Sequence, residues 1–227
     1  MKRRPLVIAH RGWSGQYVEN TMPAIRAALR LAVDFVEIDV HETRDGEVVV
    51  FHDYRLDRIC GVRKRVRDAT LAEMKRRNPG IPSLAEVLRA CRGRARVLIE
   101  IKSATPHKVA AVIKRCRMER GVIVFSLSIP VMKAFAEVAP RVPRFGLIAR
   151  NLKSSIANLK SVEVGGVGLG RRLVTSPTIV RDLHHQRLRV FVWTVNRRAE
   201  MRRLIAWGVD GLITNHPDRA NSCLARR

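Results

Sequence analysis

The chain has 227 residues, of which 46% are hydrophobic, and this length suits one domain with one substantial core. Lysine and arginine total 44 against 20 acidic residues, giving a net charge of +24. Aromatic residues make up only 5%, too few for the stacking platforms that single-strand nucleic-acid binders carry. The N-terminal apolar run covers only residues 6–9, too short for a signal peptide or a membrane span. We expect a single cytoplasmic domain over residues 1–227.

The positive charge by itself fits nucleic acid, anionic lipid headgroups or soluble phosphates. The arginines are scattered through the predicted helices rather than gathered in one tail, which favours a solvated basic surface. We therefore expect no nucleic-acid partner, and keep peripheral contact with an anionic membrane as a hypothesis. The four cysteines form no Cys-x-x-Cys pair, so neither a zinc site nor a redox motif is indicated.

In chain order, residues 6–9 are an apolar run that ends at His10, as a buried parallel strand followed by a loop would be. Apolar runs and amphipathic stretches then alternate, which predicts eight strand–helix units. Such a chain favours a TIM (βα)8 barrel, since the rival doubly wound sheet needs a glycine-rich phosphate loop that is missing after the first strand. Strands are predicted at 6–9, 35–40, 97–102, 122–126, 145–149, 164–169, 189–195 and 211–214, and helices at 20–32, 71–77, 83–92, 107–119, 130–138, 154–160, 177–186 and 198–207.

The second predicted strand continues into a β-hairpin extension. Asp45-Gly46, placed between strand-like runs, is a strong hairpin signal. Glu37 and Asp39 are two residues apart, so both carboxylates point to the same face of the strand. A turn centred on the Asp-Gly pair sets His52 opposite Asp39. One hairpin then carries two carboxylates and an imidazole.

A third carboxylate follows on the next predicted strand. Glu100 and Lys102 repeat the spacing of two, so both can point into the barrel mouth, although a local ion pair is the simpler interpretation. Together with Glu37 and Asp39, Glu100 gives three carboxylates from two strands. Oxygen ligands of this kind fit a hard divalent cation, Mg²⁺ or Ca²⁺, with Mn²⁺ as a further option.

His10 and Arg11 stand together at the end of the first predicted strand. Imidazole moves protons near neutral pH, and guanidinium can hold a phosphate through two hydrogen bonds. His52 supplies a second imidazole, which makes an acid–base pair. Trp193 lies at the end of another strand, where barrel enzymes carry their functional residues.

An ordered set of motifs resembles the glycerophosphodiester phosphodiesterase family over nearly the whole chain. Each motif alone would be weak, but their order makes the resemblance specific. The motifs are His10-Arg11-Gly12, Glu19-Asn20-Thr21, Glu37-Ile-Asp39-Val, Thr43-Arg-Asp-Gly46, His52-Asp53 with Leu56 and Arg58, Glu100-Ile-Lys102, Trp193-Thr-Val-Asn196 and Gly208-Val-Asp-Gly211.

The resemblance implies a TIM-barrel enzyme that hydrolyses glycerophosphodiesters to glycerol phosphate and an alcohol, using a divalent cation. It also implies a role for each matched position. Glu37, Asp39 and Glu100 would hold the cation, His10 and His52 would be general base and acid in an order that stays open, Arg11, Lys102, Glu19 and Trp193 would bind substrate, and Asn20 would buttress its loop.

Two features depart from the family pattern. The segment between Asp53 and Pro82 lacks the larger insertion of many members, and Thr214-Asn215-His216-Pro217 replaces a more typical Thr-Asp-x-Pro. Two alternatives stay open: a lysophospholipase-D-like enzyme that acts on membrane lysolipids, and, more remotely, a non-enzymatic nucleic-acid-binding barrel.

Overall fold

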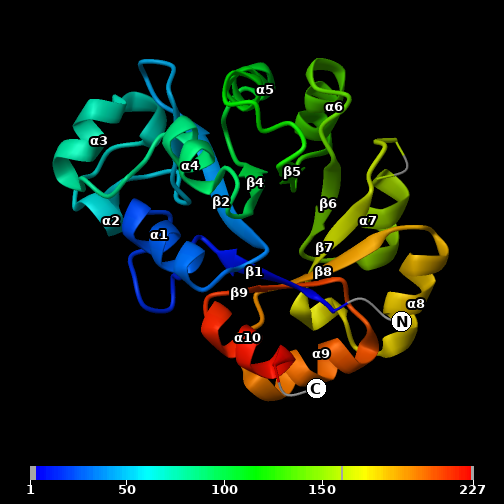
Figure 1. Cartoon of the computed structure of the whole chain (residues 1–227). Coiled ribbons are helices and arrows are strands. Elements are labelled where there is room, and N and C mark those ends of the chain that lie inside the picture. The colour runs from blue at the N-terminus through cyan, green and yellow to red at the C-terminus, as the bar shows by residue number, and fades with distance from the viewer. Residues whose placement is uncertain (1–3, 160, 226–227) are drawn as a thin grey trace.

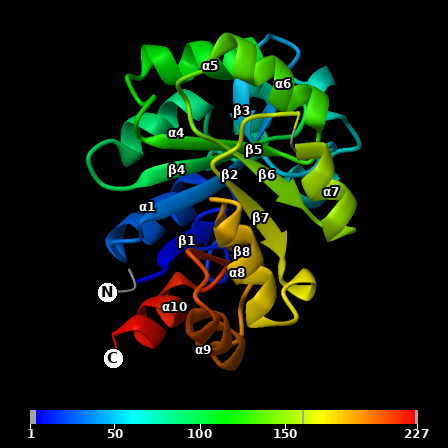
Figure 2. The ribbon, with the colours of Figure 1, turned by 90° about the vertical axis from the view of Figure 1, so that its right-hand side faces the viewer.

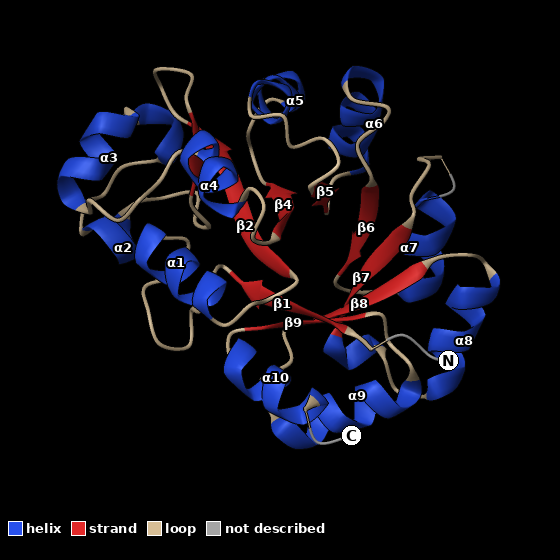
Figure 3. Ribbon diagram, viewed as in Figure 1, coloured by secondary structure: helices blue, strands red, loops and turns tan. Residues whose placement is uncertain are grey.

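Eight parallel strands close into a barrel in the computed structural model, which describes residues 4–159 and 161–225. Each strand pairs with its neighbours in parallel, and the β1–β2 pairing completes the ring. Figure 3 shows these strands at the centre with helices around them. In the order of the ring, the strands are β1 (Leu6–His10), β9 (Gly211–Thr214), β8 (Arg189–Trp193), β7 (Gly166–Gly170), β6 (Arg144–Ile148), β5 (Val122–Ser126), β4 (Arg96–Ile101) and β2 (Phe35–Glu42).

The helices form the outer layer of this barrel (Figure 1). The perpendicular view in Figure 2 shows α5 and α6 on one flank and α8, α9 and α10 on the opposite flank. Within the described residues, none of these helices combines the length and apolar character that crossing a bilayer requires. The helices are α1 (Met22–Arg30), α2 (Asp57–Cys60), α3 (Leu71–Arg77), α4 (Leu84–Cys91), α5 (Pro106–Arg115), α6 (Ile129–Val138), α7 (Leu152–Leu159), α8 (Pro177–His185), α9 (Arg198–Trp207) and α10 (Pro217–Leu224).

The predicted TIM barrel is confirmed, with each of the eight predicted strands overlapping an observed one. Helices α2 and α10 were not predicted. Helix α2 has only four residues, and α10 begins with Pro217 directly after the last strand, so neither gives a long amphipathic pattern. The last predicted residue of the 154–160 helix lies outside the described residues.

The barrel interior is filled by large side chains from alternate strand positions. Phe191 packs against Phe35 and Phe145, with ring centroids 6.2 and 4.8 Å apart. The other strand face carries residues such as Val36 and Ile38, which pack in the larger core cluster with residues of the helices. Interior and outer faces therefore bury different side chains, as the strand period of two requires. The interior cluster also contains Ile8, Leu98, Ile123, Phe125, Leu147 and Ile213.

Truncating the central aromatic side chain should have a large effect on stability. Phe191→Ala is expected to lower the free energy of unfolding by about 3–5 kcal/mol, because it removes a 1% exposed ring from this interior and leaves a cavity. Urea unfolding followed by circular dichroism measures the change. Phe191→Leu should cost clearly less, and equal losses for both variants would contradict the cavity explanation.

The hairpin after β2 is present, but its predicted register is wrong. Val40 pairs with Val50 of β3 (Val48–Val50), and the Phe51 N–H donates to the Asp39 carbonyl at 2.9 Å, so Asp39 faces Phe51 rather than His52. The cause is a loop one residue longer than assumed.

The loop contains three residues between Thr43 and Glu47, which are joined by a 3.0 Å backbone hydrogen bond. Its last residue, Gly46, has a φ of +78°, the left-handed conformation that a three-residue hairpin loop requires. The Asp45-Gly46 turn signal was correct, whereas the two-residue loop was not.

Residues 48–81 pack a second, smaller core beside the barrel. In Figure 1, α2 and α3 of this segment lie beyond β2, outside the ring of barrel helices. Capping boxes at Thr70 and Ser83 fix the starts of α3 and α4. The segment is therefore an ordered structure that can hold side chains at the barrel mouth. Its buried residues are Val49, Phe51, Leu56, Val66, Ala69, Met74 and Ile81.

Candidate active site

Three buried carboxylates meet where β2 and β4 end. The parallel register places Asp39 directly beside Glu100, and Glu37 lies two residues earlier on the same face of β2. The side chains offer carboxylate oxygens that lie within 4.8 Å of one another. Glu37 and Asp39 are each 1% exposed and Glu100 is 7% exposed. The three acidic side chains therefore converge, as the sequence predicts.

Because these three carboxyl groups are buried close together, their pKa values are shifted. Burial, and then the neighbouring Asp39, raise the pKa of Glu37 well above its usual value. The same two causes raise the pKa of Glu100 to about 7. Although burial alone would raise it, Arg11 and Lys102 hold the pKa of Asp39 below its usual value. The cluster thus carries one firmly ionised carboxylate beside two that resist ionisation.

This cluster suits a divalent cation. Asp39 Oδ1 is buried and makes no hydrogen bond to any residue of the described chain, although the Lys102 ammonium lies 3.3 Å away. A buried carboxylate oxygen without a hydrogen bond is costly unless a charge or metal meets it. Three oxygen ligands and no thiol or imidazole favour Mg²⁺, Ca²⁺ or Mn²⁺ over zinc. The residues therefore fit the expected cation, whose identity they leave open.

His10 lies at the end of β1, beside this cluster. Its Nδ1 is 2.6 Å from the Asn215 side-chain oxygen, and its Nε2 is 3.9 Å from a Glu37 carboxylate oxygen. Burial, and then the adjacent Arg11, lower the pKa of His10 to about 4. Because an amide oxygen only accepts, Nδ1 carries the proton and Nε2 keeps its lone pair. His10 is therefore a neutral imidazole at pH 7, with Nε2 as its basic nitrogen.

His52 lies two residues beyond the end of β3 and has a different set of contacts. Its Nδ1 is 2.7 Å from Asp53 Oδ1, and the other Asp53 oxygen accepts from Arg58 Nε at 2.8 Å. Its backbone carbonyl accepts from His41 Nε2 at 3.0 Å, and His41 Nδ1 lies 2.6 Å from the Ser103 hydroxyl. Buried His41 thus fixes the backbone of His52, while Asp53 orients its ring.

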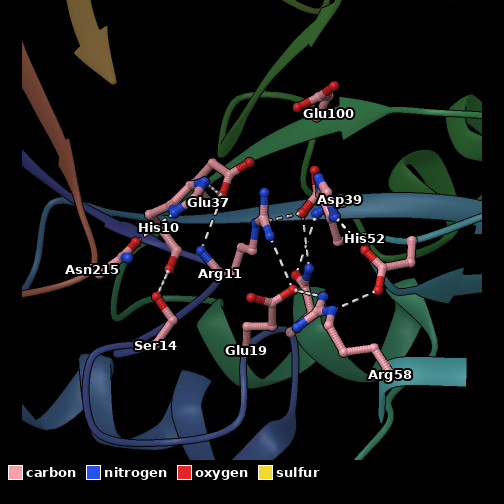
Figure 4. A network of polar contacts seen from close by, with 12 residues as sticks. His10, Arg11, Ser14, Glu19, Glu37, Asp39, His52, Arg58, Glu100 and Asn215 are labelled. Carbon is pink, nitrogen blue, oxygen red and sulfur yellow. Dashed lines mark hydrogen bonds and ion pairs between the residues drawn. The ribbon is translucent and has the colours of Figure 1, made fainter. Parts of the chain in front are cut away.

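Arg11 connects the two halves of the site (Figure 4). Its backbone N–H donates to Glu37 at 2.9 Å, its Nη1 donates to Glu19 at 2.9 Å, and its Nε lies 3.1 Å from Asp39. The Glu19 oxygen that accepts from Arg11 also accepts from Arg58 at 2.6 Å. Glu19 therefore holds two guanidinium groups in place, and Arg11 is tied to the acidic cluster.

All nine side chains selected from the sequence lie at this one mouth of the barrel. Asp39 belongs to the carboxylate cluster and Glu19 contacts Arg11. The remaining seven line a single cavity of about 230 Å³, together with apolar residues of the barrel interior. The lining residues are His10, Arg11, Glu37, His52, Glu100, Lys102, Trp193, Phe125, Leu127, Leu147 and Ile213.

Two contributing residues were missed or left without a role. His41 was not selected, although its spacing of two from Asp39 predicts the same strand face. Asn215 was noted only as a departure from the family pattern, and the structure places it against His10. His184 and His185 are exposed on α8, away from this mouth of the barrel.

These side chains converge at the carboxyl ends of the strands, where closed parallel barrels have their active sites. The molecule therefore belongs to the class of TIM-barrel enzymes. The sequence identifies the family within this class. The profile of the glycerophosphoryl diester phosphodiesterase family matches residues 10–219, and the chain belongs to this family of hydrolases.

Individual relatives match over nearly their whole length. The glycerophosphodiester phosphodiesterase of Caldanaerobacter subterraneus subsp. tengcongensis is 31% identical over 241 residues, covering 95% of this chain and 96% of the relative. The crystal structure of the Thermotoga maritima enzyme has a TM-score of 0.84 at 26% identity, covering 100% of both chains. An Oleispira antarctica phosphodiesterase, solved with its product sn-glycerol-3-phosphate, shares the fold at a TM-score of 0.86 and 21% identity, covering 98% of this chain and 97% of that one.

Proposed function

We propose that the protein hydrolyses glycerophosphodiesters to glycerol phosphate and an alcohol in a cation-dependent reaction, with His10 as general base and His52 as general acid. The observation that carries this proposal is the pair of imidazoles lining one cavity in unlike surroundings. Burial and the adjacent Arg11 keep His10 neutral, and Asn215 fixes the proton of His10 on Nδ1, whereas His52 Nδ1 lies 2.7 Å from the Asp53 carboxylate. Acid–base catalysis needs one neutral base and one protonated acid, and these surroundings suit His10 to the first role and His52 to the second.

In the proposed reaction, His10 Nε2 takes a proton from the nucleophile, and His52 gives its Nε2 proton to the oxygen of the leaving alcohol. The Asp53 carboxylate lies against His52 Nδ1 and holds the ring in orientation, as carboxylates do beside histidine in other hydrolases. The nucleophile is water or the neighbouring glycerol hydroxyl. Trapping a cyclic glycerol phosphate at early times would separate these two routes.

The phosphate would be bound by Arg11 and Lys102, which both line the cavity. Glu37, Asp39 and Glu100 would hold the divalent cation, which when bound offsets negative charge on the phosphoryl oxygens. Glu19 would keep Arg11 in position, and Trp193 would form the wall against the glycerol.

The test is incubation with glycerophosphocholine and glycerophosphoethanolamine, with and without a chelator. We expect glycerol phosphate that disappears with the chelator and returns with Mg²⁺, Ca²⁺ or Mn²⁺. A long-chain lysophosphatidylcholine tests the lysophospholipase-D alternative. The cavity of about 230 Å³ beside Trp193 is small for a ligand site and favours the deacylated substrates. Absence of chelator-sensitive glycerol phosphate would exclude the proposal.

The pH dependence of kcat/KM should be bell-shaped, because His10 must be neutral while His52 is protonated. With its pKa at about 4, His10 gains a proton, and activity falls, as the pH drops through that value. Activity falls on the alkaline side once the general acid is no longer protonated. Asn215→Asp should raise the pKa of His10, since a carboxylate favours imidazolium, and so move the acid limb upward. Asn158→Asp, on the exposed surface of α7, should leave that limb in place, and a flat profile would contradict the assignment.

A further inference from the structure

Two adjoining cavities lie near His52. The first, here the leaving-group cavity, has a volume of about 550 Å³ and is lined by His52, Lys102 and Leu127, among others. Since His52 protonates the leaving oxygen in the proposed reaction, this cavity is where the alcohol would lie. Its volume is more than twice that of the cavity beside Trp193, so a bulky alcohol fits.

The second cavity, here the arginine pocket, has a volume of about 390 Å³. Tyr54 and Arg55 line both cavities, so the two share a wall. The pocket is also close to the catalytic centre, because its His41 donates to the backbone carbonyl of His52 at 3.0 Å and packs against Tyr54 with ring centroids 4.9 Å apart. Its remaining lining residues are Arg65, Val66, Arg67 and Ser103.

The arginines of this pocket have little compensating negative charge. Arg55 pairs with Asp57 at 2.9 Å, but these side chains are 50% and 42% exposed, and exposed pairs of this kind are weak. Arg67 lies 3.9 Å from Asp68, with exposures of 70% and 56%. Arg65 has no carboxylate oxygen within 4.0 Å among the residues of the described chain. The pocket therefore has a net positive charge.

The backbone also brings two of these arginines together. Arg55 and Arg65 face each other in an antiparallel bridge, which places both side chains on the same face. Like charges directly opposite each other in such a pair are destabilising. An anion between them would remove the repulsion. The Ser103 hydroxyl lines the same pocket, and its proton is donated to His41 Nδ1. Both ring nitrogens of His41 are already engaged, so this residue serves as a wall.

From these contacts we propose that the arginine pocket binds a second anionic group, carried by the leaving alcohol of the substrate. The preferred substrates are then glycerophosphodiesters whose alcohol bears a phosphate monoester, spanning from the phosphodiester at His52 across Tyr54 to Arg65 and Arg67. The inference rests on the proposed phosphodiesterase activity and names its substrate class. It also assigns a substrate-binding function to the short segment after Asp53, which supplies all three arginines.

The test compares two substrates that differ by one phosphate, glycerophosphoinositol and glycerophosphoinositol 4-phosphate. The wild type should cleave the phosphorylated compound with a kcat/KM about tenfold higher or more, the range expected for charge-assisted hydrogen bonds. In Arg65→Ala/Arg67→Ala the ratio of the two kcat/KM values should fall towards one. Arg55 is left unchanged because it lines both cavities.

The matched control is Arg26→Ala/Arg89→Ala, which removes the same charge from the exposed faces of α1 and α4 and should keep the preference. Added salt gives a second measurement on the wild type, since the preference should shrink as screening increases. A preference that persists in Arg65→Ala/Arg67→Ala would overturn the inference.

Other outcomes separate the inference from the proposed function. Cleavage of both compounds without preference would overturn the pocket assignment and leave the phosphodiesterase activity intact, whereas cleavage of neither would remove both. The pocket could also take free phosphate or a lipid headgroup. An Arg65- and Arg67-dependent effect of inorganic phosphate, or binding to phosphatidylglycerol vesicles, without substrate preference would point to those sources and overturn the substrate inference.

Discussion

Replacement of His52 by alanine is expected to lower kcat for glycerophosphocholine by about 10²–10⁴-fold, the usual contribution of a positioned proton donor or acceptor. The reason is that the leaving alcohol then departs as an alkoxide. His52 lines both the cavity beside Trp193 and the leaving-group cavity, so it can reach the leaving oxygen. The change should appear mainly in kcat, because proton transfer belongs to the transition state.

A second substrate separates the acid role from a general loss of structure. A glycerophosphodiester with a 4-nitrophenol leaving group needs no protonation, so the loss for His52→Ala should shrink with that compound. The loss for His10→Ala should persist, because the nucleophile still requires a base. His185→Ala, exposed on α8, provides the control. Equal losses for His52→Ala with both leaving groups would contradict its assignment as the acid.

Asp39→Asn is expected to abolish the stabilisation of the fold by divalent cations. At a cation concentration about 100 times the dissociation constant, binding stabilises a folded protein by about 2.7 kcal/mol. For a chain of this size, that stabilisation corresponds to roughly 5–11 °C in melting temperature. Asp39 should be decisive because it is the carboxylate of the cluster whose pKa is lowered and whose Oδ1 lacks a hydrogen bond.

Thermal melts with a chelator and with Mg²⁺, Ca²⁺ or Mn²⁺ measure this effect without any assay of activity. The quantity compared is the cation-induced shift within each protein, so a change in the variant's own melting temperature does not enter. Asp68→Asn, an exposed carboxylate, should keep the shift. If Asp39→Asn is stabilised as strongly as the wild type, the cation lies elsewhere.

Much of the barrel could be predicted because buried parallel strands are short apolar runs with functional residues at their ends. Glu37, Asp39 and Glu100 follow from that pattern, since the spacing of two fixes the face of a strand. The hairpin register could not be predicted as reliably. A single additional loop residue, accommodated by the left-handed Gly46, shifted every pair by one position.

Contacts between distant segments were harder to predict. His41 looks like an ordinary strand residue until its ring nitrogens are seen against Ser103 and the carbonyl of His52. Asn215 lies 205 positions from His10, and no local pattern links the two. Such residues orient other side chains and do not react themselves. Neither their residue type nor their place in the sequence therefore indicates their role.

The bond between His10 and Asn215 joins the last residue of the first strand, β1, to the loop that follows the last strand, β9. During synthesis, the carboxylates and Arg11 emerge within the first half of the chain, whereas Asn215 emerges near its end. A nascent chain therefore holds its basic imidazole without its orienting partner until β9 closes the ring beside β1. The proposed catalytic base is therefore oriented only when the barrel closes.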